Sequence, residues 1–134
     1  MQFATDNGAL PQGATVCRAE LHTNAGLMGD DDSRNLIGRY CTGDFPIVEE
    51  NWTDSFTPDA IAGVPLGSLP PDGGAPLLVI DDLSGITPTA KTGLCLGISG
   101  GEPSGTDGAW VASFDTPFGI GPQLWVWFNV PPTP

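Results

Sequence analysis

Apolar and polar residues alternate most regularly over residues 14–22, and this period of two predicts a half-buried β-strand. The alternation assigns its residues to two faces. One face is expected to carry Thr15, Cys17, Ala19 and Leu21, and the other Val16, Arg18, Glu20 and His22. The first set contains the residues suited to a core, so we expect the second set to face solvent.

A second alternating segment, 123–130, lies near the end of the chain and is apolar on both faces. Trp125 and Trp127 project to one side, and Leu124, Val126 and Phe128 to the other. The prolines at 131 and 132 cannot donate ladder hydrogen bonds and end the strand. Because a two-faced apolar strand invites aggregation when it lies at a sheet edge, we expect it to be central in its sheet or covered by another chain.

Short apolar runs separated by Gly, Pro, Ser, Thr and Asp predict the remaining elements. Strands are expected at 36–41, 45–49, 76–81, 93–99 and 109–114, with a turn at 42–44 and irregular loops at 23–34 and 64–75. An N-cap threonine, a proline at the first helical position and a closing glycine predict one short helix over 57–63.

This pattern predicts an all-β protein: a single compact β-sandwich or small β-barrel, with long Gly/Pro-rich loops and at most one short helix. Length argues for one domain, over residues 14–130. Residues 1–13 are expected to form an extended N-terminal arm and residues 131–134 a Pro-rich C-terminal tail, both ordered only by neighbouring subunits.

The charge balance restricts the classes of partner. Sixteen acidic residues against four basic ones give a formal net charge of −12. Nucleic-acid binding and attachment to an anionic membrane both need clustered Lys and Arg, so we expect neither. The first residues lack the basic start and apolar core of a signal peptide. The three cysteines have no CxxC spacing and fit reduced thiols of a protein made in the cytoplasm, while a disulfide such as Cys17–Cys41 is the alternative.

Three features of the sequence resemble known types of binding or catalytic site. Residues 77–92 approach a P-loop preceded by an acidic strand, but Ala90 replaces the glycine before Lys91 and Pro88 removes an N–H, so a strand and a turn are expected instead. The loop Asp30–Asn35 departs from an EF-hand and leaves an irregular calcium site or a solvated acidic loop. His22 is the sole histidine, so a small hydrolase would need it as its base. We expect it to be an exposed or edge residue, and expect no catalytic residue, metal or cofactor.

The tryptophans carry the most information about function. The strand at 123–130 could be an interior strand of a sandwich, a strand buried in a protein–protein contact, where Trp is enriched, or a platform on which Trp rings stack on sugars. Our candidate interface residues are Trp125, Trp127, Phe128, Trp110 and Phe3.

Residues 76–82 (Pro-Leu-Leu-Val-Ile-Asp-Asp) and 90–98 (Ala-Lys-Thr-Gly-Leu-Cys-Leu-Gly-Ile) resemble the head decoration proteins of tailed bacteriophages. The general build is similar too: small, acidic and rich in Gly and Pro. The resemblance implies a β-rich protein, often trimeric, that clamps neighbouring capsid subunits. It transfers no functional residue.

We therefore expect a non-enzymatic virion structural protein, a capsid decoration or cement protein that stabilises a shell by bridging subunits. Its partners would be the major capsid protein or other virion subunits, and copies of itself in a homo-oligomer such as a trimer. It would be made in the host cytoplasm, not secreted, and located in the virion. The alternative is a carbohydrate-binding β-sandwich that uses Trp stacking.

Overall fold

Nine strands make up almost all of the regular structure in a computed structural model, which describes residues 1–28, 34–41, 60–99, 108–111 and 121–132. In chain order the strands are β1 (Gln2–Phe3), β2 (Thr15–His22), β3 (Ala25–Met28), β4 (Asn35–Cys41), β5 (Ile61–Pro65), β6 (Leu78–Val79), β7 (Thr92–Ile98), β8 (Gly108–Val111) and β9 (Gln123–Asn129). A 3-10 turn, η2 (Leu66–Ser68), follows β5.

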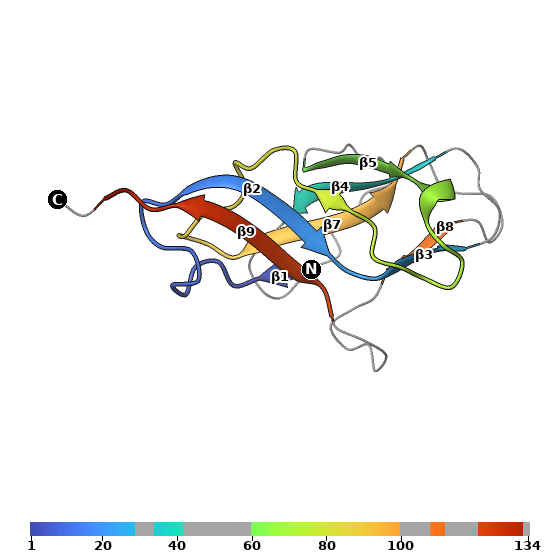
Figure 1. The fold of residues 1–134 in the computed structure, drawn as a ribbon, viewed down its shortest axis with the longest axis horizontal. Coiled ribbons are helices and arrows are strands. Elements are labelled where there is room, and N and C mark those ends of the chain that lie inside the picture. The colour runs from blue at the N-terminus through green and yellow to red at the C-terminus, as the bar shows by residue number, and fades with distance from the viewer. Residues whose placement is uncertain (29–33, 42–59, 100–107, 112–120, 133–134) are drawn as a thin grey trace.

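The strands form a sandwich-like arrangement of antiparallel sheets (Figure 1). One sheet has the order β1-β7-β4-β5 and the other β6-β2-β9, while β3 and β8 form a separate two-stranded ribbon. The all-β prediction is confirmed, and of its two forms the sandwich fits, since the sheets do not close into a barrel. The division into arm, domain and tail stays a prediction.

The core lies between the two larger sheets and is built from aliphatic side chains of both. Leu21 and Leu78 from one sheet and Leu36, Ile61 and Leu94 from the other are each no more than 2% exposed. At one side the sandwich is closed by backbone bonding. There the amide of Asp81, just after β6, donates to the carbonyl of Ala60, just before β5, at 2.6 Å.

Several of the strands predicted from the sequence are present in the structure, whereas the predicted helix and one predicted loop differ. Strands predicted at 14–22, 36–41, 93–99 and 123–130 are present, the one at 76–81 is shortened to β6, and β8 covers the described part of the one at 109–114. The helix predicted over 57–63 is wrong where the structure describes it, because Ile61 begins β5. The loop predicted over 23–34 contains β3. The predictions for 42–49 and for Asp30–Asp32 lie outside the described residues.

The N-terminal segment begins with strand β1 and continues through turns at 6–9 and 12–13, and it contacts the rest of the protein. Gln2 and Phe3 pair with β7, and the amide of Leu94 donates to the carbonyl of Met1 at 2.9 Å. The Thr5 hydroxyl is buried against that of Thr92, with 2.9 Å between the oxygens, and Leu10 is 3% exposed. Apolar burial and backbone pairing thus attach this segment to β7 and to the core.

The P-loop lookalike is a strand followed by turns, as its sequence indicated. The amide of Ile86 donates to the carbonyl of Leu83 at 3.1 Å, which closes a turn directly after the strand segment. The Tyr40 hydroxyl donates to the carbonyl of Asp82. Gly85 lies against the Tyr40 ring so closely that any Cβ would overlap it, which explains the glycine.

Two of the three cysteines are bonded, so the expectation of reduced thiols is wrong for them. Cys41 on β4 and Cys95 on β7 form a disulfide with a Cα–Cα distance of 5.9 Å. They lie on neighbouring antiparallel strands, one diagonal step apart in register, a separation that the bond can span. Cys17 is exposed and keeps its thiol, so the alternative Cys17–Cys41 pairing is also wrong.

We predict that replacing Cys41 and Cys95 together by Ala lowers the free energy of unfolding by about 2–4 kcal/mol, because the bond restricts the unfolded chain over a long loop. The two residues are 54 apart in the sequence. Urea denaturation of the variant, compared with Cys17→Ser, would measure the difference. Equal stability of the two variants, or alkylation of three thiols in the native protein without reductant, would contradict the assignment.

Candidate functional site

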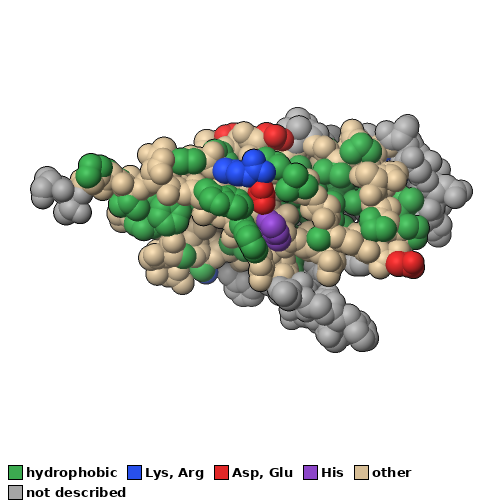
Figure 2. All heavy atoms as spheres, viewed as in Figure 1, with side chains coloured by type: hydrophobic (Ala, Val, Ile, Leu, Met, Phe, Trp, Pro, Cys, Tyr) green, Lys and Arg blue, Asp and Glu red, His purple; other side chains and the backbone are tan. Residues whose placement is uncertain are grey.

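Among the described residues, the exposed aromatic side chains gather where β2 pairs with β9. Opposite pairs in this ladder are Arg18 with Trp127, Glu20 with Trp125 and His22 with Gln123. All six side chains lie on the side of the sheet away from the core, and we call this set the outer face. Figure 2 shows charged and histidine side chains in one row across the middle of this view, beside hydrophobic ones.

A β-bulge at Cys17 sets which residues reach the outer face. The register shifts between Val16, which pairs with Phe128, and Arg18, which pairs with Trp127. The extra residue moves Val16 to the inner side, where it packs against the core. The sequence-based placement of Val16 beside Arg18 is therefore wrong, whereas Arg18, Glu20 and His22 share a face as predicted.

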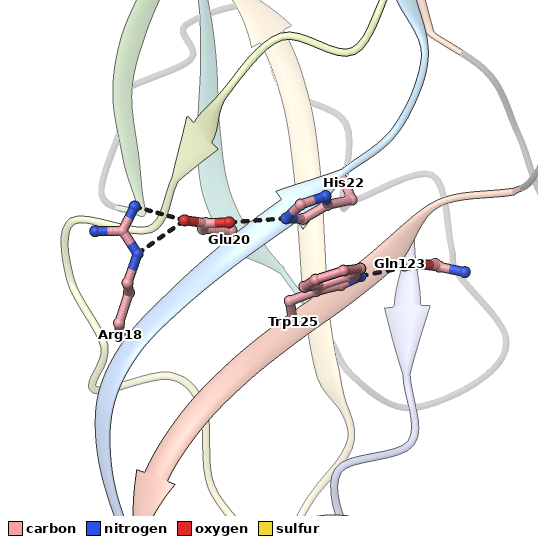
Figure 3. A network of polar contacts seen from close by, with 5 residues as sticks. All are labelled: Arg18, Glu20, His22, Gln123 and Trp125. Atoms are coloured by element: carbon pink, nitrogen blue, oxygen red, sulfur yellow. Dashed lines mark hydrogen bonds and ion pairs between the residues drawn. The ribbon is translucent and has the colours of Figure 1, made fainter.

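Glu20 is the centre of a polar network on this face (Figure 3). Its Oε1 accepts hydrogen bonds from Nε of Arg18, at 2.8 Å, and from Nη2 of the same guanidinium. Its Oε2 lies 2.8 Å from Nε2 of His22. The Glu20 side chain is only 11% exposed, so it forms the floor of the face between two more exposed basic groups.

The aromatic rings extend the network across to β9. The His22 ring stacks on Trp125 with 4.2 Å between centroids and an interplanar angle of 13°. The Arg18 guanidinium carbon lies 5.9 Å from the Trp127 ring centroid, within the range of a cation–π contact. Nε1 of Trp125 donates to Oε1 of Gln123 at 2.9 Å. These contacts hold both indoles in place while leaving Trp125 48% and Trp127 43% exposed.

The inner side of β9 borders a separate feature at the open side of the sandwich. A hollow of about 330 Å³ is lined by Leu124, Val126 and Phe128 of β9 and by residues of the N-terminal segment, namely Phe3, Ala4, Thr5, Ala9 and Leu10. We call it the edge hollow. Phe128, at its rim, is 36% exposed.

The five candidate interface residues thus fall in three places. Trp125 and Trp127 lie together on the outer face, and Phe3 and Phe128 line the edge hollow. Trp110 lies on β8, in the two-stranded ribbon, where it pairs with Gly26. Sequence reasoning did not include Arg18, Glu20, His22 and Gln123 in the site. Their alternation was visible, but their meeting with the tryptophans depends on a pairing between the two ends of the chain.

β9 is not central in its sheet, which corrects the first of the two sequence-based alternatives. The order β6-β2-β9 places it at the edge, and among the described residues its one hydrogen-bonded neighbour is β2. The tryptophan side is not a second internal layer either, since both indoles are nearly half exposed. Cover by another chain stays a prediction.

Metal and membrane chemistry find no candidate in the described part of the chain. It holds no cluster of three or more His, Cys, Asp or Glu side chains that could bind a metal ion, and no helix long and apolar enough to cross a membrane. The chain matches no protein-family model, no curated protein and no solved structure.

The network makes stability depend on pH in a defined direction. Hydrogen bonds from Arg18, and then from His22, hold the pKa of Glu20 below its ordinary value of 4.5. A carboxylate with a lowered folded pKa stabilises the fold above its ordinary pKa, and this contribution is lost as the pH falls through the lowered value.

We therefore predict that Glu20→Gln is less stable than the wild type above pH 4.5, and that the difference shrinks in more acidic solution. Thermal unfolding between neutral and acid pH would measure it, with Asp6→Asn, at an exposed residue, as the control for losing one negative charge. A difference that persists unchanged into acid would show that the network does not hold Glu20 ionised.

Proposed function

We propose that this protein is a non-enzymatic structural protein of a virion, a capsid decoration or cement protein that bridges shell subunits through the outer face of β2 and β9. The observation that carries the proposal is the pair of indoles that the fold holds in place yet leaves exposed, Trp125 and Trp127. Fixed aromatic side chains next to an arginine are typical of the central residues of protein interfaces, since they bring large contact area at low conformational cost.

The charge of the face supports a protein partner of mixed surface. Around the two tryptophans the described charges are those of Arg18, Glu20 and His22, and the ion pair between Arg18 and Glu20 is internal to the face. Of the 16 acidic and four basic residues of the chain, all but Glu20 and Arg18 lie outside this face. Contact through the outer face therefore brings a neighbour to a part of an acidic protein where Arg18 offsets the carboxylate of Glu20 and local repulsion is weak.

The Cys41–Cys95 disulfide suits a location in the virion better than one in a reducing cytoplasm. Disulfides persist on particle surfaces outside the cell, and glutathione and thioredoxin reduce them inside it. A protein made in the host cytoplasm, as proposed, would then complete this bond after release.

The proposal predicts that Trp125→Ala and Trp127→Ala impair attachment to the shell more than they impair folding. Because both side chains are nearly half exposed, each change is expected to lower the free energy of unfolding by roughly 1 kcal/mol. Quantitative mass spectrometry of gradient-purified phage heads would measure attachment, and denaturation would measure folding. Leu21→Ala, on β2 but 1% exposed, is the matched control and is expected to cost about 2–5 kcal/mol.

Two results would count against this function. One is absence of the wild-type chain from heads made by the phage that encodes it. The other is attachment by the double tryptophan variant at the wild-type level.

Carbohydrate binding is a second candidate, and a specific feature of the outer face favours it. Hydrogen-bonding side chains lie beside both indoles. Arg18 is the cross-strand partner of Trp127. The pair formed by His22 and Gln123 is the next pair along the outer face from Trp125. A pyranose ring that stacks on an indole presents its hydroxyls sideways, toward such groups. The two indoles are tilted by 46° to each other, with centroids 6.2 Å apart, which suits a short, twisted glycan better than a flat polysaccharide surface.

For this candidate we expect sugars to change the tryptophan fluorescence, and Trp125→Ala to abolish the change. Titration with a panel of soluble oligosaccharides, with and without calcium, would measure it. Leu77→Ala, at an exposed apolar residue outside the outer face, is the control variant. No response to any member of the panel would exclude a glycan-binding role.

A further inference from the structure

Within the part of the chain that the structure describes, strand β9 has no strand paired to its outer edge, and an apolar hollow lies beside it. The edges of the two sheets that are formed by β9 and β1 border the same hollow, whereas the opposite edges are joined by the backbone bond from Asp81, after β6, to Ala60, before β5. A strand added to β9 would gain ladder hydrogen bonds. It would also point its inner side chains toward the edge hollow, on the same side as Leu124, Val126 and Phe128.

The edge lacks the devices by which proteins prevent such pairing. Segment 123–130 contains no charged residue and no proline, and β9 is seven residues long. Exposed edges are usually protected by lysine, by proline or by short length. In β9 the prolines come only after the strand has ended, at 131 and 132.

The sequence of β9 is complementary to itself when reversed about its centre. Antiparallel pairing with a second β9 centred on Val126 uses all seven residues. It sets Trp125 opposite Trp127 of the second copy, Leu124 opposite Phe128, and the amide of Gln123 opposite that of Asn129. Each cross-strand pair thus joins two aromatic, two apolar or two polar residues, and such matched pairs stabilise a sheet.

We propose that β9 binds the β9 strand of a second copy of this chain, in antiparallel register about a two-fold axis at Val126. The contact joins the two β6-β2-β9 sheets into one continuous sheet. It brings Phe128 of each copy beside Leu124 of the other, next to the edge hollow, and so covers apolar surface that the single chain exposes. A two-fold contact of this kind is isologous and closes at two copies, which differs from the expected trimer.

Charge determines when the contact forms. Each copy carries a net charge of −12, so two copies repel each other at long range, although the paired strands themselves are uncharged. Salt screens this repulsion, since the Debye length shortens from about 30 Å at 0.01 M to about 8 Å at physiological ionic strength. Pairing between two copies is therefore expected to strengthen with salt, whereas binding of a basic partner would weaken.

The outer face stays uncovered in the paired form, with the four tryptophans of two copies side by side. The inference therefore goes beyond the proposed function and is measured separately. Native mass in the absence of any shell reports the pairing of two copies, and attachment to heads reports the outer face.

A cross-linking experiment tests the register. In the full-length protein with Cys17→Ser, which removes the exposed thiol, Val126→Cys would place two thiols on the two-fold axis. Opposite Cα atoms there lie about 4.5–5.5 Å apart, within the range of a disulfide. We expect a covalent dimer under mild oxidation, at salt concentrations where the parent protein has dimeric mass. Leu77→Cys, 62% exposed and next to β6 at the opposite edge of the sheet, is expected to give none.

A pair of charge variants tests the same register without cross-linking. Gln123→Lys with Asn129→Glu sets opposite charges together across the axis, whereas Gln123→Lys with Asn129→Lys sets like charges together. Both sites are exposed in the single chain, so folding should be retained and is checked by circular dichroism. The second variant is expected to raise the dimer dissociation constant by at least about tenfold relative to the first, although it lowers the net negative charge.

Two outcomes would overturn the proposal. One is monomeric mass for the parent protein by sedimentation at every salt and protein concentration, with no covalent dimer from Val126→Cys. The other is equal association of the two charge variants, or equal cross-linking at 77 and 126, because neither is compatible with an axis at Val126.

Discussion

The pairing of β2 with β9 is the interaction on which both the core and the surface of this protein depend. It joins the two ends of the chain, Thr15 to Asn129 and His22 to Gln123. On the inner side it brings Ala19 and Leu21 beside Val126 and Leu124, and so completes one wall of the core. On the outer side it creates the row of Arg18, Glu20 and His22 beside two tryptophans. Contacts between such distant residues close a large loop before they stabilise the fold, so this pairing is expected to form late in folding.

The bulge at Cys17 lets β2 contribute Val16 to the core and still carry a row of polar residues on its outer side. Without it, Val16 would follow the alternation of Arg18, Glu20 and His22 and face solvent. The extra residue returns Val16 to the inner side opposite Phe128 and leaves Cys17 exposed, where its sulfur accepts a hydrogen bond from the Asn129 side chain at 3.2 Å. The core therefore continues to the end of the ladder, and the polar row stays restricted to the three residues that bind one another.

The pattern of apolar and polar residues within single segments was enough to predict where several strands lie. The period of two placed β2 and β9 in the sequence and assigned both sides of β9 correctly, and apolar runs between turn residues placed β4 and β7. It misplaced Val16 because a bulge leaves no mark in a regular alternation. It also read Thr57–Gly63 as a helix from its cap residues, whereas Ile61 forms β5 beside Gly38, where only a glycine leaves room for the isoleucine side chain. Packing between distant strands decided this segment and overrode its local signals.

Sheet order and disulfide pairing are non-local in the same way. A strand with two apolar faces was expected to be central in its sheet or covered by another chain, and it lies at the edge. Cys41 and Cys95 become neighbours only because β4 and β7 pair in the register that sets Arg39 opposite Cys95 and Cys41 opposite Gly93. Spacing of cysteines along the chain contains no information about that register, and three cysteines allow three single pairings.

An exposed apolar edge on an acidic protein is a combination with physical consequences. The edge alone would promote uncontrolled strand addition, and a net charge of −12 alone would keep copies apart. Together they make association conditional, because pairing occurs only where repulsion is screened or where a neighbouring surface compensates it. The Glu20 network acts in the same direction locally: it uses the charge of Arg18 within the face, so that the tryptophans present an aromatic surface with little net charge. Long-range repulsion with short-range apolar complementarity selects partners that fit closely and rejects those that only approach.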